Sequence, residues 1–130
     1  MDLNRVVLQG MVGTDLELRK TTTSKKAVTS FRVATTAHFK DEEGTIIEST
    51  QWHNVVAWED MAELAVANLQ KGSQVYIEGS LRTRSYEAEV REGSKKVNTT
   101  LYVTEVVVRS IQPIDVHPVT NGKDSTEARA

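Results

Sequence analysis

The side chains of this chain that are best suited to chemistry are aromatic rings. Both tryptophans fall within the nine-residue stretch TQWHNVVAW at positions 50–58, although few of the 130 residues are aromatic. Residues two apart in a β-strand share a face, so Trp52, Asn54 and Trp58 are expected on one face and the alternate residues on the other. The pattern leaves two interpretations open. Rings beside a polar amide can stack on a flat ligand, or they can fill the core.

Two more rings, Phe39 and Tyr86, lie close to cations, the second one in the basic run LRTRSY. Every nucleic acid base has a flat π-face, so an exposed ring stabilises a bound base by about 1–3 kcal/mol without reading its identity. Nearby arginines and lysines neutralise phosphates. Duplex DNA keeps its bases stacked inside, so this combination favours a flexible single strand as ligand. Phe31 shares a face with Val33 and is instead expected in the core.

Residues with the spacing of a catalytic or metal site are not found. The chain has no cysteine, and its three histidines (His38, His53 and His117) are too scattered for a metal-ligand pattern. No nucleophile is paired with an acid or base at a motif spacing. We therefore expect neither an enzyme nor a bound cofactor.

The charge is distributed in patches. The net charge is −2 and the pI about 5.9, which is unusual for a nucleic-acid binder. Positions 5–40 are mostly basic, however, positions 41–63 contain only acidic charges, and positions 82–96 are again mainly basic. Such a surface can attract a polyanion locally, although a solvated mixed-charge surface is the alternative. The N-terminal MDLNRVVLQG is too polar for a signal peptide, so a cytoplasmic location is expected.

Hydrophobic periodicity predicts five strands and one helix. The strands are expected over 3–12, 27–36, 48–58, 73–81 and 101–111, and the helix over 60–71. Asp60 and Glu63 resemble a capping box at the helix start, and Lys71-Gly72 a helix stop. Met61, Leu64, Ala65 and Leu69 are expected to form the apolar face of the helix.

This order of elements predicts an all-β fold. Five strands with one helix between the third and fourth are typical of the OB-fold, a small Greek-key barrel. The polar segment 83–100 is expected to be an exposed, hairpin-like loop with a turn at 92–94. The domain is expected to cover residues 1–112, and residues 113–130 to form a disordered tail.

Five stretches in order resemble the bacterial single-stranded DNA-binding protein family. They are NRVVLQGMVGTDLELR (4–19), KAVTSFRVAT (26–35), TQWHNVVAW (50–58), KGSQVYIEGSLRTRSY (71–86) and TEVVV (104–108). The resemblance covers about residues 3–112. No single stretch is specific, but the ordered set is highly specific.

The resemblance implies a nucleoid-associated homotetramer that binds single-stranded DNA without sequence preference in DNA replication, recombination and repair. The stacking positions of the family fall on Phe39, Trp52, Trp58 and Tyr86. Its cationic positions fall on Arg5, Lys40, Lys71, Arg82 and Arg84. His53 and Tyr76 match positions at the subunit interfaces of the family.

Several residues depart from the family pattern. Leu16 replaces a usual proline, and Asn54 stands where arginine is common. Glu59-Asp60 replaces a Gly-Lys type pair and puts two negative charges beside Trp58. These changes are expected to weaken phosphate contacts, so that stacking carries more of the affinity. The segment between Tyr86 and Tyr102 is expected to be longer than usual.

The C-terminus is the largest departure. The family normally ends in an acidic tip finishing in Pro-Phe that recruits replication and repair proteins, whereas this chain ends GKDSTEARA. Recruitment by that route is therefore not expected. A tail-less paralogue, a phage or plasmid version and a truncated form all remain open.

A second hypothesis also remains open. The acidic segment 41–63 and the missing acidic tip suit an OB-fold adaptor of the primosome type, which acts mainly through protein partners. Capture of replication proteins together with very weak DNA binding would favour this adaptor. Salt-sensitive binding of oligo-dT would favour the DNA-binding hypothesis.

Overall fold

The computed structural model describes residues 1–114, which form one barrel with a single helix. Its elements in order are β1 (Val6–Val12), β2 (Arg19–Lys20), β3 (Ala27–Lys40), β4 (Ile46–Trp58), α1 (Asp60–Asn68), β5 (Gln74–Glu92) and β6 (Lys95–Ile114). The predicted OB-fold is confirmed. The last strand continues to Ile114, two residues past the expected domain boundary, and the rest of the predicted tail lies outside the described residues.

The barrel closes because β1 pairs with strands on both of its sides. The sheet order is β1-β5-β6-β4-β3-β2, and β1 also pairs with β3 at Met11 and Val12. Gly10 makes the turn of β1 between its two partners feasible, because a Cβ at this position would lie 2.1 Å from the Ala34 carbonyl oxygen. Gly79 has the same role in β5, at a register shift where a Cβ would lie 2.1 Å from the Val107 carbonyl oxygen.

Strand alternation fills the core as predicted. Thr29, Phe31 and Val33 of β3 point inward and are buried, whereas Ser30 and Arg32 between them are exposed. Core positions of two further strands follow the same alternation, with Val55 and Ala57 from β4 and Val75 and Ile77 from β5. The face of β4 that packs on the core is therefore the face predicted from the sequence, opposite to Trp52 and Trp58.

Helix α1 covers one end of the barrel, but two details of its prediction were wrong. Ala62 and Ala65 are fully buried against the barrel, whereas Leu64, expected on the apolar face, is 39% exposed. The predicted face is thus correct except at Leu64, and the small side chain of Ala62 packs on the core in its place. Met61 and Leu69 do pack against the core.

The ends of α1 also differ from the prediction. The N-cap residue is Glu59, with a φ of 53° and no side-chain hydrogen bond, so Asp60 is already helical and forms no capping box. The helix ends at Asn68 because Leu69 turns extended to bury its side chain. Gly72 does have a positive φ, but in the next turn, where its N–H donates to the Val12 carbonyl.

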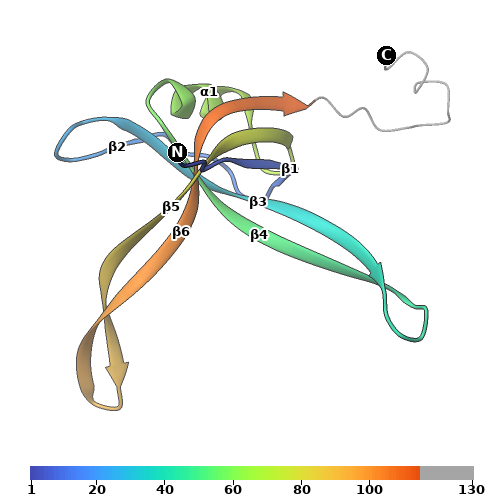
Figure 1. The fold of residues 1–130 in the computed structure, drawn as a ribbon. Coiled ribbons are helices and arrows are strands. Elements are labelled where there is room, and N and C mark those ends of the chain that lie inside the picture. Colours follow the sequence, from blue (N-terminus) through green and yellow to red (C-terminus); the bar gives the residue numbers. More distant parts are fainter. Residues whose placement is uncertain (115–130) are drawn as a thin grey trace.

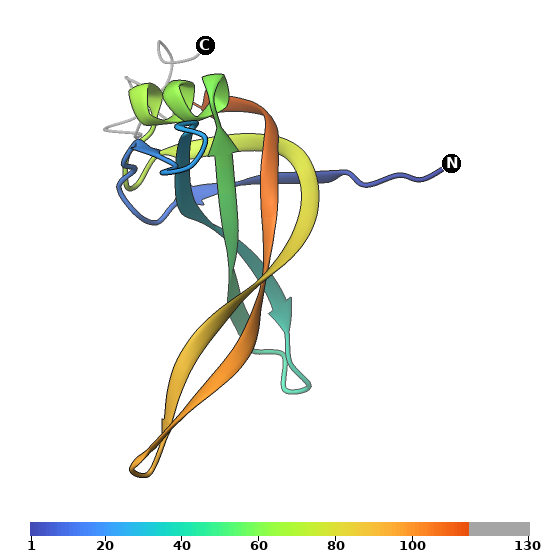
Figure 2. The same cartoon turned by 90° about the vertical axis from the view of Figure 1, so that its left-hand side faces the viewer.

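Two long hairpins extend from the end of the barrel opposite α1 (Figure 1, Figure 2). One joins β3 to β4 through a turn at Gly44, and the other joins β5 to β6 through a turn at Gly93; both glycines have a positive φ. The hairpin-like segment predicted at 83–100 is therefore a hairpin with its turn at 92–94, but its arms are regular strand, paired up to Glu92 and Lys95. The β-branched residues Val90 and Val97 face each other in this ladder and favour the extended backbone.

Candidate nucleic-acid interface

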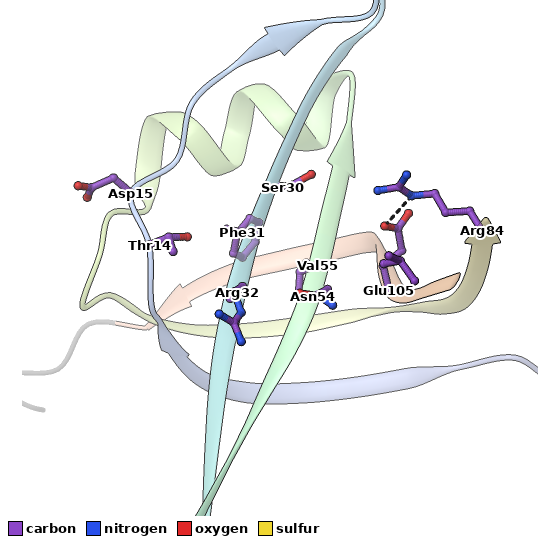
Figure 3. A pocket seen from close by; sticks show the side chains of 10 residues that line it. Thr14, Asp15, Ser30, Phe31, Arg32, Asn54, Val55, Arg84 and Glu105 are labelled. Atoms are coloured by element: carbon purple, nitrogen blue, oxygen red, sulfur yellow. Dashed lines mark hydrogen bonds and ion pairs between the residues drawn. The ribbon is translucent and has the colours of Figure 1, made fainter. Parts of the chain in front are cut away.

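Three adjoining clefts cross the barrel surface where the outward residues of β3, β4 and β5 meet. Their volumes are about 440, 290 and 380 Å³. The first shares Ser30, Arg84 and Glu105 with the second, and the second shares Trp58 and Arg82 with the third. The three are therefore treated together as one surface, called the groove. Figure 3 shows its first part, with Arg32 and Asn54 on β3 and β4 and Arg84 beside Glu105.

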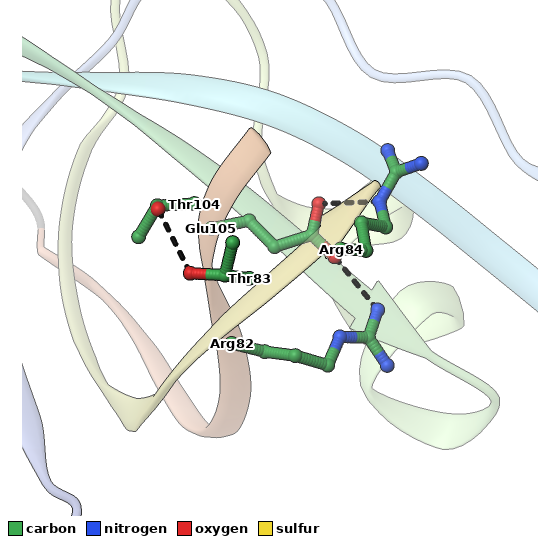
Figure 4. A network of polar contacts seen from close by, with 5 residues as sticks. All are labelled: Arg82, Thr83, Arg84, Thr104 and Glu105. Atoms are coloured by element: carbon green, nitrogen blue, oxygen red, sulfur yellow. Dashed lines mark hydrogen bonds and ion pairs between the residues drawn. The ribbon is translucent and has the colours of Figure 1, made fainter. Parts of the chain in front are cut away.

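A buried carboxylate organises the cations of the groove. Glu105 of β6 is only 5% exposed and accepts hydrogen bonds from Arg82 Nη2 at 2.7 Å and from Arg84 Nε at 3.1 Å (Figure 4). A buried charge is costly unless it is paired, so this carboxylate holds both guanidinium groups in place. Two cations over one anion leave a net positive charge, and both arginine side chains are about half exposed. Their remaining N–H groups are free to bind phosphate.

Trp52 stands beside the groove with a cation over its ring. It is 46% exposed, and the guanidinium carbon of Arg32 lies 5.2 Å from its ring centroid. Gly13 makes room for the ring, since a Cβ there would lie 2.2 Å from its Cζ3 atom. Glycine and arginine together hold the indole in a defined position with part of its surface in solvent.

Arg32 is a functional candidate that was not predicted from the sequence. The alternation of β3 did place it outward with Ser30, which was the available signal, but nothing in the sequence alone reveals its neighbours across the sheet. In the structure Arg32 lies directly opposite Asn54 of β4. A cation is therefore present beside the position where Asn54 was expected to weaken phosphate contacts.

The four predicted stacking residues lie at different places. Trp58 is half-buried and lines two clefts of the groove, next to Arg82. Trp52 adjoins the groove through Arg32. Phe39 and Tyr86 are exposed and lie on the two hairpins, on β3 and β5. The structure thus brings the two tryptophans to the barrel surface and leaves the other two rings on the hairpins.

The predicted phosphate-binding cations also lie partly in the groove and partly outside it. Arg82 and Arg84 line the groove. Arg5 precedes β1 and forms an ion pair with Glu78 at 3.4 Å, while Lys40 ends β3 on its hairpin. Lys71 follows α1, where its backbone N–H donates to Asp15. Lys26, which was not predicted, lines the third cleft with Trp58.

The two predicted interface residues lie away from the groove and have partners within the chain. His53 Nε2 lies 2.8 Å from Thr35 Oγ1. The Tyr76 hydroxyl donates to Glu78 at 2.7 Å on the outer side of β5. This hydrogen bond raises the pKa of Tyr76 and lowers the pKa of Glu78, which the nearby Arg5 lowers further.

Acidic and histidine side chains within residues 1–114 form no group of three that could hold a metal ion. No helix in that part of the chain is long and apolar enough to cross a membrane.

Comparison with known proteins gives consistent matches. The model of the single-strand binding protein family matches residues 3–114. The single-stranded DNA-binding protein 1 of Chlorobaculum tepidum is 44% identical over 110 residues, which are 85% of this chain and 64% of that protein. The single-stranded DNA-binding proteins of two Neisseria meningitidis strains are 39% identical over 89 residues, which are 68% of this chain and 51% of those proteins. The chain thus spans about half to two-thirds of the length of these relatives.

Solved structures share the same fold. The Plasmodium falciparum protein SSB in complex with single-stranded DNA superposes with a TM-score of 0.69 at 24% identity, covering 88% of this chain and 97% of the other. A deletion mutant of the single-stranded DNA binding protein from Thermus aquaticus gives a TM-score of 0.68 at 27% identity, covering 87% of this chain and 51% of the other.

Proposed function

The chain belongs to the single-strand binding protein family, and from this premise we propose that it binds and protects single-stranded DNA without sequence preference. It acts by binding and not as an enzyme. Its roles are those of a coating protein in DNA replication, recombination and repair, and it works in the cytoplasm on exposed single strands of the nucleoid.

One observation supports this function most directly. An outward tryptophan, Trp58, and two guanidinium groups oriented by a buried carboxylate line the same groove. A base can stack on the ring while its phosphates approach Arg82 and Arg84. Neither contact depends on which base is present, and a base inside a duplex cannot make the stacking contact. Trp52 and Arg32 extend this surface along β3 and β4.

The remaining predicted residues extend the binding track onto the hairpins. Lys40 continues it along the Arg32 face of β3, and Tyr86 follows Arg82 and Arg84 on the same face of β5. Phe39 lies on the other face of the β3–β4 hairpin and is proposed as an exposed ring at the end of the track. A strand that follows these side chains leaves the barrel along both hairpins. Lys71, which follows α1, and Arg5, which precedes β1, do not line the groove and are proposed as outer phosphate contacts.

We also propose that four copies assemble. The outer side of the β1–β5 pair carries the exposed apolar side chains of Val7 and Met11 beside Tyr76, and an exposed apolar surface of this kind is typical of a contact between copies. His53 is the second proposed contact. The track of one copy would then continue on the next.

Binding to labelled oligonucleotides tests the function. The full chain should bind oligo-dT, with an affinity that falls as salt rises, and should bind a duplex of the same length far more weakly. Bound oligo-dT should also resist a single-strand nuclease. Equal binding to duplex and single strand would contradict the proposal, because the rings would then contribute nothing.

The adaptor hypothesis is favoured by one surface, the tip of the β3–β4 hairpin. Ile46 and Ile47 are exposed there beside Asp41 and Glu43, a combination that suits a protein partner better than a phosphate backbone. Capture of replication proteins that is lost in Ile46→Ser, with DNA affinity unchanged, would support this role.

A further inference from the structure

The third cleft of the groove has a composition that differs from the rest. It is lined by Thr21, Ser24, Lys26, Trp58, Glu59 and Arg82, and its volume of about 380 Å³ is in the range of small-molecule sites. Trp58 supplies a surface for stacking, and Lys26 and Arg82 supply positive charge for a phosphate. Glu59 adds a carboxylate, which can only accept hydrogen bonds.

The Glu59 carboxylate is not engaged by the part of the chain that the structure describes. It forms no ion pair or side-chain hydrogen bond within residues 1–114, and it does not cap α1. Glu105, in contrast, is fully occupied by two arginines. Of the two carboxylates that line the groove near Trp58, Glu59 is therefore the one with acceptor oxygens available to a ligand.

The backbone of Glu59 is fixed in an unusual conformation. Its φ of 53° lies in the left-handed region, which side chains other than glycine rarely adopt, and its N–H donates to the Ala27 carbonyl at 2.8 Å. A bond to β3 and the start of α1 thus hold the residue next to Trp58. The carboxylate is kept at a position where glycine would fit more easily.

We propose that this cleft is a base subsite that favours bases with an exocyclic amino group, and cytosine over thymine. A base stacked on Trp58 presents its edge inside the same cleft as the Glu59 carboxylate. Cytosine has an N4 amino group at this edge, and this group can donate a hydrogen bond to the Glu59 carboxylate. Thymine has the O4 oxygen at the same place, and two acceptors, O4 and the carboxylate, would then face each other without a hydrogen bond. The two bases stack similarly, so the hydrogen bond at the base edge determines which base binds more tightly.

This inference rests on the proposed DNA binding. It adds a base preference at one subsite of a surface that otherwise binds all bases alike. It concerns Glu59 alone among the acidic residues at the start of α1. Asp60 is its neighbour in sequence, is also exposed, and does not line the cleft, so it provides a matched control of equal charge.

The test compares oligo-dC and oligo-dT of equal length at one salt concentration. The probe proteins are the full chain, Glu59→Gly and Asp60→Asn; glycine suits the positive φ, so the first variant should fold. We expect Glu59→Gly to lower the ratio of dC to dT affinity by about fivefold, and Asp60→Asn to leave the ratio unchanged while raising both affinities slightly.

The two ways of failing are distinct. Strong oligo-dT binding with the same dC to dT ratio in the full chain and in Glu59→Gly would overturn the subsite alone. Failure of the full chain to bind either oligonucleotide would overturn the proposed function and the subsite with it. A ratio that falls equally in Asp60→Asn would also overturn the subsite, because the effect would then be one of charge.

Discussion

Arg32 lies over the ring of Trp52, with its guanidinium carbon 5.2 Å from the ring centroid. The two residues belong to paired strands, and Gly13 of the preceding segment leaves space for the indole. Arg32 and Gly13 thus hold the Trp52 ring in position while about half of it stays exposed. A ring that is already ordered loses little conformational entropy when a base stacks on it, which favours binding.

Replacing Trp52 with alanine should weaken binding without unfolding the barrel. The expected loss is about 1–3 kcal/mol of binding free energy for each base that no longer stacks, while thermal stability changes little because the ring is half exposed. Binding of labelled oligo-dT measures the loss. Trp52→Phe is the control and should keep most of the affinity. Full affinity in the alanine variant would show that this ring does not meet DNA.

Gly13→Ala should disturb the same ring indirectly. The added Cβ would lie 2.2 Å from Trp52 Cζ3, so the indole must move away from its contact with Arg32. We expect a shifted tryptophan emission spectrum in the free protein and weaker oligo-dT binding. An unchanged spectrum and affinity would mean that the position of the ring is not set by Gly13.

Arg84→Gln should reduce the salt dependence of binding. Loss of one phosphate contact lowers the slope of log K against log salt by about 1, or somewhat less for a single strand. Glu105 keeps Arg82 as its partner, so the buried carboxylate stays paired. Lys96→Gln is the control, because Lys96 pairs with Glu89 near the tip of the β5–β6 hairpin, on the face opposite to Arg84. An unchanged slope in Arg84→Gln would remove Arg84 from the DNA contact.

Assembly should depend on the outer side of β1. Val7→Glu places a charge on an exposed apolar position beside Glu78, so the tetramer should dissociate into smaller species. Leu64→Glu, at an exposed position of α1, should leave the assembly intact. Light scattering after size-exclusion chromatography measures both masses. A tetramer that persists in Val7→Glu would place the contact elsewhere.

The pair of Tyr76 and Glu78 predicts a pH effect on stability. The pKa of Glu78 is lowered in the folded chain, so its contribution is present above the unfolded pKa and is lost as the pH falls through the folded one. The pKa of Tyr76 is raised, so its contribution is lost at high pH. Thermal unfolding of Tyr76→Phe should therefore depend less on pH at both extremes. An identical pH profile would contradict this coupling.

Strand alternation is the part of this molecule that the sequence predicts best. It gives the inward face of β3 with Phe31, the inward face of β4 and the outward position of Trp52, because burial on one side of a strand repeats every second residue. The helix was predicted from apolar residues spaced three to four positions apart. Its predicted face was wrong at one position, since Ala62 and Leu64 exchange roles through close packing that a period cannot reveal.

Contacts between distant residues could not be predicted. Glu105 is the one charged residue in the stretch TEVVV, and only the register of β5 with β6 shows that Arg82 lies opposite it. The position of Arg32 over Trp52 likewise requires the pairing of β3 with β4. The polar segment 83–100 was expected to be a hairpin-like loop, because its charged side chains give no alternating apolar pattern from which the regular pairing of β5 with β6 could be predicted.

The most direct test of the account is tryptophan fluorescence during titration with oligo-dT at low and high salt. Trp52→Phe and Trp58→Phe each leave one indole, so the signal of each ring can be followed alone. We expect strong quenching in both variants, with an affinity that decreases as salt rises. Binding without quenching of either tryptophan, or no binding at all, would contradict the claim that these rings hold single-stranded DNA.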